Sequence, residues 1–317
     1  MKILVTGSAG YIGSNLTLAL RARAYDAVGV DSFNDYYSPR IKRHWALGIE
    51  AAGGMTTEAD LSSDPLAGIL QGVECVVHLA AQPGISAATP WESYFKNNIL
   101  ATHRLVEACK EAGVRRFINI ATSSVYGLNA DGNETVAPQP ASWYGVTKLA
   151  AEQEVLASCR GGHLPACSLR LFSVYGERER PEKLVPLLIK SIVSDTPFPL
   201  YEGSRDHLRS FTYVGDICEG IIKVLENWDA AEGEIFNLGS DQVFSTGDAI
   251  EVIEEILGKK SRIAAMPPRP GDQKSTKANV DKIADTLGWR PSTGLREGIG
   301  RTVAWYLADI HEKVAWE

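Results

Sequence analysis

A phenol and an ammonium group stand four residues apart near the middle of the chain. Tyr144 and Lys148 lie in a segment with helical patterning, residues 144–158, and this spacing puts both side chains on one helix face. A nearby cation stabilises a phenolate, so such a tyrosine can act as a base around neutral pH. The pair indicates proton removal from a hydroxyl group, although the same spacing is also common on solvated helix faces.

Hydroxyl side chains follow a predicted strand at residues 116–121. Thr122, Ser123 and Ser124 come directly after it, and in a parallel sheet this is the end at which ligands bind. The Thr122 hydroxyl can there hydrogen-bond the same substrate oxygen that Tyr144 deprotonates. The presence of this hydroxyl favours a catalytic role for Tyr144 and Lys148 over a solvated helix face.

Three glycines near the N-terminus have the spacing of a phosphate-binding loop. Gly7, Gly10 and Gly13 follow the apolar run Lys2–Thr6 and open a helical pattern at residues 11–24. The first two let the backbone turn tightly and approach a pyrophosphate, the third lets the helix pack on the strand, and the helix N-terminus supplies donors. A plain tight turn is the alternative, but the strand, loop and helix occur in the expected order.

A carboxylate stands at the end of the second predicted strand, residues 27–30. Asp31 comes 18 residues after Gly13, where an acidic side chain accepts hydrogen bonds from a ribose diol and repels a 2′-phosphate. The sequence therefore predicts a bound dinucleotide, with NAD favoured over NADP.

Strands and helices alternate along the first half of the chain, as in a sheet covered by helices on both faces. The predicted strands are Lys2–Thr6, residues 27–30, 75–79 and 116–121, and Ala166–Leu171, and the helices include residues 94–112 and 144–158. We expect an α/β fold of the Rossmann type, a doubly wound parallel sheet.

The strict alternation ends after about Phe172. Helical patterns at Leu184–Val193, residues 216–227 and Thr246–Leu257 are separated by segments rich in proline and glycine. We expect residues 1–170 to form the NAD-binding domain. Residues 171–317 should form a smaller C-terminal α/β lobe that binds substrate, with some segments packing back on the first domain.

Composition restricts the class of protein. The 317 residues are 44% hydrophobic and carry 32 basic against 39 acidic side chains, a net charge of −7, which argues against nucleic acid or anionic lipid as a partner. The five cysteines (Cys75, Cys109, Cys159, Cys167 and Cys218) are scattered without a CxxC pair, so we expect buried thiols, no structural metal and a reducing compartment. No apolar run reaches the length of a membrane span, and a cytoplasmic location is expected.

Together, the glycine loop, Asp31, Thr122 and the Tyr144–Lys148 pair resemble the extended short-chain dehydrogenase/reductase family, in its nucleotide-sugar epimerase/dehydratase branch, over essentially the whole chain. The resemblance implies NAD as the cofactor. The cofactor contacts that it implies are Gly7, Gly10, Tyr11, Ile12, Gly13, Asp31, Asp60, Leu61, Leu79, Ala80, Ala81, Asn98, Tyr144 and Lys148. The substrate contacts that it implies are Ser123, Ser124, Ser173, Arg180, Arg209, Arg269 and Asp272.

The resemblance also implies a reaction through a 4-keto sugar. In this family the tyrosinate takes the proton of the 4-hydroxyl while hydride leaves carbon 4 for the nicotinamide. Related 4,6-dehydratases carry an Asp-Glu pair before the Val-Tyr-Gly motif, and uronate decarboxylases carry a Glu in the second of these positions. Here Ser123 and Ser124 stand instead. The remaining outcome is rotation of the keto sugar and return of hydride to its other face, which is epimerisation at carbon 4.

Three segments bear on which sugar is bound. Residues 31–37, 81–85 and 172–181 are most similar to those of UDP-glucuronate 4-epimerases, in which an Arg-Pro element contacts the sugar carboxylate. Arg180 stands at that position, and a surface arginine in a charged loop is the alternative interpretation. UDP-hexose 4-epimerases of the galactose type, some acting on N-acetylhexosamines, are the second candidate class.

Two further alternatives belong to other classes of protein. One is a catalytically idle dinucleotide-binding sensor or scaffold, which should have lost Tyr144, Lys148 or the Thr122 hydroxyl; all three are present. The other is a reductase that consumes external NADPH and releases its cofactor after each turnover. By resemblance, helices at residues 94–112 and 144–158 should form the interface of a homodimer.

Overall fold

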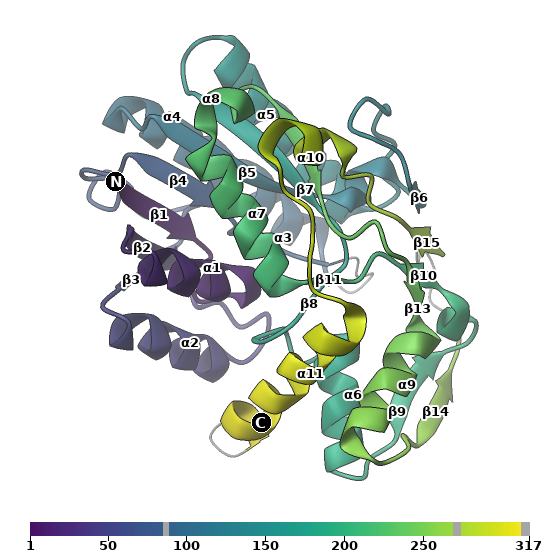
Figure 1. Ribbon diagram of the computed structural model, residues 1–317. Coiled ribbons are helices and arrows are strands. Elements are labelled where there is room, and N and C mark those ends of the chain that lie inside the picture. The colour runs from purple at the N-terminus through teal and green to yellow at the C-terminus, as the bar shows by residue number, and fades with distance from the viewer. Residues whose placement is uncertain (85–88, 269–273, 312–317) are drawn as a thin grey trace.

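The computed structural model describes residues 1–84, 89–268 and 274–311, and a seven-stranded parallel sheet forms its centre (Figure 1). From one edge to the other the strands run β3, β2, β1, β4, β5, β7 and β12. Their bounds are β1 Lys2–Thr6, β2 Asp26–Asp31, β3 Thr56–Glu58, β4 Cys75–His78, β5 Arg116–Thr122, β7 Ala166–Leu171 and β12 Ile235–Leu238. The predicted α/β fold with a Rossmann-type parallel sheet is confirmed.

Helices cover both faces of this sheet because the strands are apolar on both sides. Ile3 and Val5 of β1 belong to one buried cluster, whereas Leu4 between them belongs to the other. Figure 1 shows α1, α2 and α7 on one face, with α4 and α5 on the opposite face. Their bounds are α1 Tyr11–Ala22, α2 Pro39–Ala51, α4 Ala101–Ala112, α5 Trp143–Arg160 and α7 Val214–Glu226.

The helix expected at residues 94–112 differs from the prediction. It begins earlier, with α3 at Trp91–Tyr94, and continues through a π-helical turn at Phe95–Leu100 into α4. In the wider turn Asn98 is buried, where its side chain bonds both backbone groups of Gln82. The amphipathic pattern predicted a helix here, but the π turn depends on these contacts across the chain.

Two strands of the central sheet were not predicted. β3 has only three residues, and β12 lies far along the chain, after the alternation of strands and helices has ended. β12 nevertheless pairs in parallel with β7 and lies next to it in the sheet. The second half of the chain thus contributes to the central sheet, and a domain boundary near residue 170 stays a prediction.

The remaining elements lie mostly beyond the carboxyl edge of the central sheet (Figure 1). A four-stranded sheet contains, in spatial order, β13 (Phe244–Ser245), β10 (Leu208–Arg209), β15 (Ser275–Thr276) and β6 (Asn129–Ala130). A two-stranded sheet pairs β8 (Val174–Tyr175) with β11 (Thr212–Tyr213), and another pairs β9 (Phe198–Tyr201) with β14 (Ile263–Met266). The helices there are α6 Leu184–Val193, α9 Thr246–Leu257 and α11 Leu295–Trp305, and the short helices α8 Trp228–Ala231 and α10 Asp281–Leu287 flank β12 along the chain.

Candidate active site

A cavity of about 440 Å³ opens at the carboxyl ends of β1, β2, β4 and β5. Parallel sheets bind ligands at this edge because loops and helix N-termini converge there. Eighteen predicted site residues line this one cavity: Gly7, Gly10, Tyr11, Ile12, Gly13, Asp31, Asp60, Leu61, Leu79, Ala80, Ala81, Thr122, Ser123, Ser124, Tyr144, Lys148, Ser173 and Arg180.

The glycine loop brings backbone close to backbone at the mouth of α1. Gly7 adopts a left-handed φ of +67°, and its N–H donates to the carbonyl of Val30 at 2.8 Å. A Cβ on Gly13 would lie 2.1 Å from the carbonyl oxygen of Gly7, so only glycine fits there. Gly10 precedes the helix with no side-chain cap. The first N–H groups of α1 therefore remain available to a phosphate group, and the loop fits a dinucleotide.

Asp31 is fixed by backbone donors at the end of β2. The N–H groups of Ala9 and Phe33 donate to its two carboxylate oxygens at 3.1 Å and 2.9 Å. Burial raises the pKa of Asp31, while these N–H groups and the nearby Lys42 oppose that rise. Each carboxylate oxygen has a second lone pair, so Asp31 can still accept the hydroxyls of a ribose.

A buried chain of hydrogen bonds fixes the segment after β4, which lines the cavity. The Thr6 hydroxyl accepts from the N–H groups of Leu79 and Ala80 at 3.1 Å and lies 2.8 Å from Nδ1 of His78. Nε2 of His78 lies 2.9 Å from the Thr102 hydroxyl. Burial, followed by the charge of Lys148, lowers the pKa of His78 to about 3. His78 is therefore neutral and structural, and it positions the lining residues that follow it.

Asn98 lies behind the cavity wall and does not line it. Its Oδ1 accepts from the N–H of Gln82 at 2.7 Å, and its Nδ2 donates to the Thr147 hydroxyl at 3.0 Å. These contacts tie the loop after β4 to α5. A direct cofactor contact by Asn98 stays a prediction, and the geometry places its side chain among protein groups.

Tyr144 and Lys148 project from the first two turns of α5 into the cavity. The Ser142 hydroxyl caps this helix by accepting from the N–H of Gly145 at 3.1 Å. A Cβ on Gly145 would lie 2.6 Å from the carbonyl oxygen of Ser124, so glycine permits the close approach of α5 to the hydroxyl-bearing turn. The base and the hydroxyls, separated along the chain, therefore face the same space.

Burial shifts the pKa of both members of this pair. Burial raises the pKa of Tyr144, whereas the Thr122 hydroxyl and then the charge of Arg180 lower it. Burial lowers the pKa of Lys148 to about 8, and the Glu152 carboxylate one turn further along the helix opposes this. Lys148 therefore retains its proton at neutral pH, where its charge can stabilise a phenolate.

Thr122 ends β5 and caps the short 3₁₀ turn Ser123–Tyr126. Its Oγ1 accepts from the N–H of Ser124 at 3.2 Å and donates to the Ser124 hydroxyl at 3.2 Å. Three hydroxyls thus border the cavity beside Tyr144. They can orient a substrate oxygen, and none of them supplies a carboxyl group.

Arg180 is buried, with 9% of its surface exposed, so it is not a surface arginine. Its guanidinium carbon lies 5.3 Å from the centre of the Tyr36 ring, and Nη1 lies 3.1 Å from Oε1 of Glu182. Among the described residues this ion pair is the polar contact of Nη1, and no hydrogen bond of good geometry accompanies it. Arg180 therefore presents a positive charge to the cavity, with its Nη1 in an ion pair with Glu182.

The sequence analysis missed other cavity residues, among them the polar side chains of Tyr36, Tyr37, Lys42 and Glu179. Lys42 is buried and donates to the backbone and side-chain oxygens of Asn34 at 2.7 Å and 2.6 Å. Burial raises the pKa of Glu179 to about 8, although Lys183 and Arg180 lower it. The two tyrosines and Glu179 fall in segments that resemble those of epimerases, residues 31–37 and 172–181, whereas no local pattern marks Lys42.

One predicted substrate contact lies outside the cavity lining, and two others fall outside the described residues. Arg209 lies on β10, outside the lining, and Nη1 donates to the carbonyl of Leu208 at 2.9 Å. Arg269 and Asp272 fall outside the described residues. The substrate contacts implied for Arg209, Arg269 and Asp272 stay predictions. Within the described ranges, no helix is long and apolar enough to cross a membrane, and no three metal-binding side chains cluster.

The fold and the cavity together define a dinucleotide-binding α/β protein, and three comparisons narrow the class. Residues 3–239 match the NAD dependent epimerase/dehydratase family. The chain is 34% identical to the uncharacterized UDP-glucose epimerase YtcB of Bacillus subtilis (strain 168), over 98% of this chain and 99% of that protein. It is also 34% identical to UDP-glucuronate 4-epimerase 6 of Arabidopsis thaliana, over 97% of this chain and 72% of that protein.

A solved structure of a relative has the same fold as this chain. The UDP-glucuronic acid 4-epimerase of Bacillus cereus, in complex with UDP-glucuronic acid and NAD, superposes with a TM-score of 0.91 at 35% identity, over 96% of this chain and 98% of that chain. The chain belongs to the NAD dependent epimerase/dehydratase family. The resemblance inferred from its motifs is thereby confirmed.

Proposed function

We propose that this protein is an NAD-dependent 4-epimerase of a UDP-sugar, and that it interconverts UDP-glucuronate and UDP-galacturonate through a transient 4-keto intermediate. NAD, when bound, accepts hydride from carbon 4 and returns it to the opposite face of the sugar. Members of the same family that bind both NAD and UDP-glucuronic acid support this proposal.

The meeting of Tyr144, Lys148 and Thr122 on one cavity with the glycine loop carries the proposal. Tyr144 removes the proton of the 4-hydroxyl and later returns it. Lys148 stabilises the phenolate by its charge, and the Thr122 hydroxyl holds the reacting oxygen in place. Because Ser123 and Ser124 add hydroxyls where elimination or decarboxylation would use acids, return of hydride is the outcome we assign.

Arg180 supports a uronate as the sugar. A carboxylate at carbon 5 must leave water to enter the cavity, and the buried Arg180 guanidinium compensates for this loss. The effect of Arg180 on the pKa of Tyr144 is consistent with a guanidinium near the reacting centre. The carboxylate and the 4-hydroxyl of one sugar ring would then be bound together.

A substrate panel tests the proposal. Purified protein is incubated separately with UDP-glucuronate, UDP-glucose and UDP-N-acetylglucosamine, and products are identified by NMR. We expect UDP-galacturonate from the first, with no net NADH and with NAD needed only in catalytic amounts. Stoichiometric reduction of added NAD would instead identify a dehydrogenase or an oxidative decarboxylase.

The second candidate is a 4-epimerase of a neutral UDP-hexose or N-acetylhexosamine, which the similarity to the Bacillus subtilis protein favours. Turnover of UDP-glucose alone in the panel would establish it. A panel without any turnover by protein that retains NAD would favour the idle sensor or scaffold. Consumption of external NADPH with cofactor release would identify the reductase.

We also propose a homodimer that packs α3, the π turn, α4 and α5 of one subunit against the same elements of the other. Trp91, Phe95 and Trp143 are exposed on these elements at 38%, 45% and 60%, and the rings of the two tryptophans lie 5.1 Å apart. Exposed aromatic side chains in one region are typical of interfaces. Sedimentation equilibrium should give twice the chain mass, and Trp143→Arg should give the single-chain mass.

We also propose that the protein acts in the cytoplasm, a reducing compartment. Its five free cysteines are consistent with this location.

A further inference from the structure

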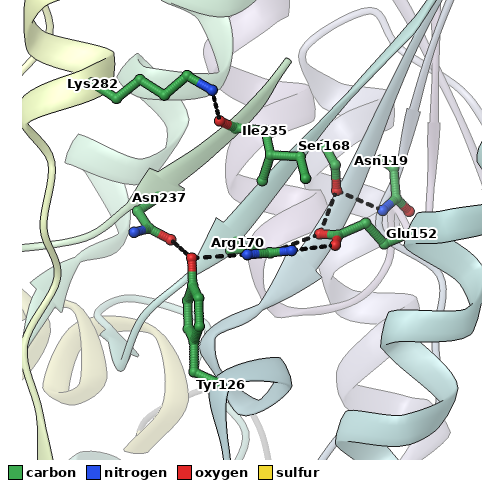
Figure 2. A network of polar contacts seen from close by, with 8 residues as sticks. All are labelled: Asn119, Tyr126, Glu152, Ser168, Arg170, Ile235, Asn237 and Lys282. Carbon is green, nitrogen blue, oxygen red and sulfur yellow. Dashed lines mark hydrogen bonds and ion pairs between the residues drawn. The ribbon is translucent and has the colours of Figure 1, made fainter. Parts of the chain in front are cut away.

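A buried ion pair lies beneath the active-site helix. Arg170 of β7 donates from Nε and Nη2 to the two oxygens of Glu152 on α5, at 3.0 Å and 2.6 Å. Both side chains are almost completely buried, at 2% and 0% exposure. Figure 2 shows the fork of the guanidinium facing the carboxylate, with the Ser168 hydroxyl as a third donor at 3.1 Å.

The same arginine reaches a second functional element. Nη1 of Arg170 donates to the Tyr126 hydroxyl at 2.9 Å, which in turn donates to Oδ1 of Asn237 at 2.8 Å (Figure 2). Tyr126 ends the 3₁₀ turn that Thr122 caps. One side chain on β7 thus binds both the helix that bears Tyr144 and the turn that bears the cavity hydroxyls.

Stability alone does not explain this pair. Removing two charges from water is costly, and apolar replacement of a buried ion pair is often neutral or stabilising. None of Tyr126, Glu152 and Arg170 lines the cavity, so none of them can touch a ligand bound there. Such fixed geometry matters in catalysis because small displacements of reacting groups reduce the rate strongly.

Glu152 also has an electrostatic effect on Lys148. The two residues lie one turn apart on the buried face of α5. Burial lowers the pKa of Lys148 and the Glu152 carboxylate opposes that effect. His78 at the end of β4 is affected by the charge of Lys148 and is itself neutral, whereas Tyr144 stands one turn before Lys148 on the same helix.

We propose that Arg170 is a positioning residue of this enzyme: by binding Glu152 and Tyr126 together it sets the placement of Tyr144 against Thr122, and it holds the Glu152 carboxylate beside Lys148. The proposal rests on the proposed epimerase function and deepens it. Neither Arg170 nor Glu152 touches substrate or cofactor in this assignment.

Three variants separate positioning from folding. The double variant Glu152→Met/Arg170→Met removes the pair without leaving a lone buried charge. Tyr126→Phe removes only the link to the hydroxyl turn, and Glu152→Gln removes only the charge. Asp216→Asn is the matched control, because Asp216 on α7 is a buried carboxylate that accepts four hydrogen bonds from Ser292 and Thr293 away from the cavity.

Kinetics give the first readout. In the double variant and in Tyr126→Phe we expect kcat to fall by roughly 10- to 100-fold with KM for the UDP-sugar nearly unchanged. In Glu152→Gln the loss of kcat at high pH should begin at a lower pH than in the wild type. Asp216→Asn should lose thermal stability and retain the wild-type kcat. Folded variants with the wild-type kcat and pH profile would overturn the proposal.

A second readout does not need turnover. The pH dependence of Lys148 acetylation by acetic anhydride is followed by mass spectrometry on the full chain after removal of dinucleotide. We expect the midpoint to move to lower pH in Glu152→Gln and to stay in place in Asp216→Asn. If the wild type is inactive on every UDP-sugar and this shift occurs, the proposed function is wrong while the role of Glu152 stands. An unchanged midpoint contradicts the link to Lys148 whether or not the enzyme is active.

Discussion

The N–H of Ala9, inside the glycine loop, donates a 3.1 Å hydrogen bond to Oδ2 of Asp31 at the end of β2. The loop that is suited to bind the pyrophosphate and the carboxylate that is suited to bind the ribose are therefore joined directly. A substitution of Asp31 is therefore expected to change both the affinity for the cofactor and the conformation of the loop.

Asp31→Ala should weaken the binding of NAD and lessen the discrimination against NADP. A hydrogen bond to a charged group contributes about 1.5–3 kcal/mol, so the Kd for NAD should rise by roughly 10- to 100-fold. Calorimetric titration with both dinucleotides measures this. Asp26→Ala, an exposed carboxylate at the other end of β2, should bind like the wild type. An unchanged preference in Asp31→Ala would remove Asp31 from cofactor recognition.

Tyr144→Phe should lose about 10²- to 10⁴-fold in kcat because the ring is retained and the proton acceptor is not. Thr122→Val should lose less, since it removes an orienting hydrogen bond and leaves the base. NAD binding and thermal stability of the Phe variant check that the fold is intact, and Tyr25→Phe, outside the cavity, is the control. Turnover close to wild type in Tyr144→Phe would identify a different base.

Arg180→Ala should reduce kcat/KM for UDP-glucuronate by about 100-fold, as expected when a desolvated charge loses its partner. Turnover of UDP-glucose, where present, should change little. The 4-keto uronate is a β-keto acid, so without Arg180 to hold the carboxylate in the plane of the ketone a trace of decarboxylated pentose is expected by NMR. Arg205→Ala, an exposed arginine paired with Glu251, serves as the control. If turnover of UDP-glucuronate survives Arg180→Ala, a neutral UDP-hexose is favoured as the substrate.

Gly13→Ala should destabilise the fold and abolish NAD retention, because the new Cβ would lie 2.1 Å from the carbonyl of Gly7. Overpacking of this kind costs about 1–3 kcal/mol. Gly48→Ala is the matched control: Gly48 is an exposed glycine inside α2 with no atom within 4 Å of the added carbon. It should gain roughly 0.5–1 kcal/mol in urea unfolding. Equal effects of the two substitutions would contradict the close approach at Gly13.

Glu179 should make the protein less stable as the pH rises. Burial raises its pKa from the ordinary 4.5 to about 8, so between these values the folded state binds more protons than the unfolded state. The free energy of unfolding therefore falls from pH 5 to about pH 8 and levels off above it. Glu179→Gln should be more stable than the wild type at pH 8 and lose this part of the pH dependence. Thermal melts at several pH values measure the difference; parallel profiles would show that Glu179 ionises normally.

Local sequence determined much of the site. A glycine loop between a strand and a helix, an acid after the second strand, and a tyrosine and lysine one turn apart are short-range patterns. Each constrains the backbone of its own segment, so the segments could be recognised one at a time. Their convergence also follows, because carboxyl ends of parallel strands share one edge of the sheet.

Only the tertiary structure decided the contacts between distant segments. β12 lies beside β7, Asn98 turns inward to Gln82, and Arg170 joins Glu152 to Tyr126, although none of these pairings has a local pattern. The same holds for Glu179, whose burial in the cavity depends on how its loop packs. Burial and long-range hydrogen bonding are properties of the assembled chain, since they depend on which residues exclude water from a given group. The sequence therefore determined the chemical groups, and the packing determined their charge, their orientation and their partners.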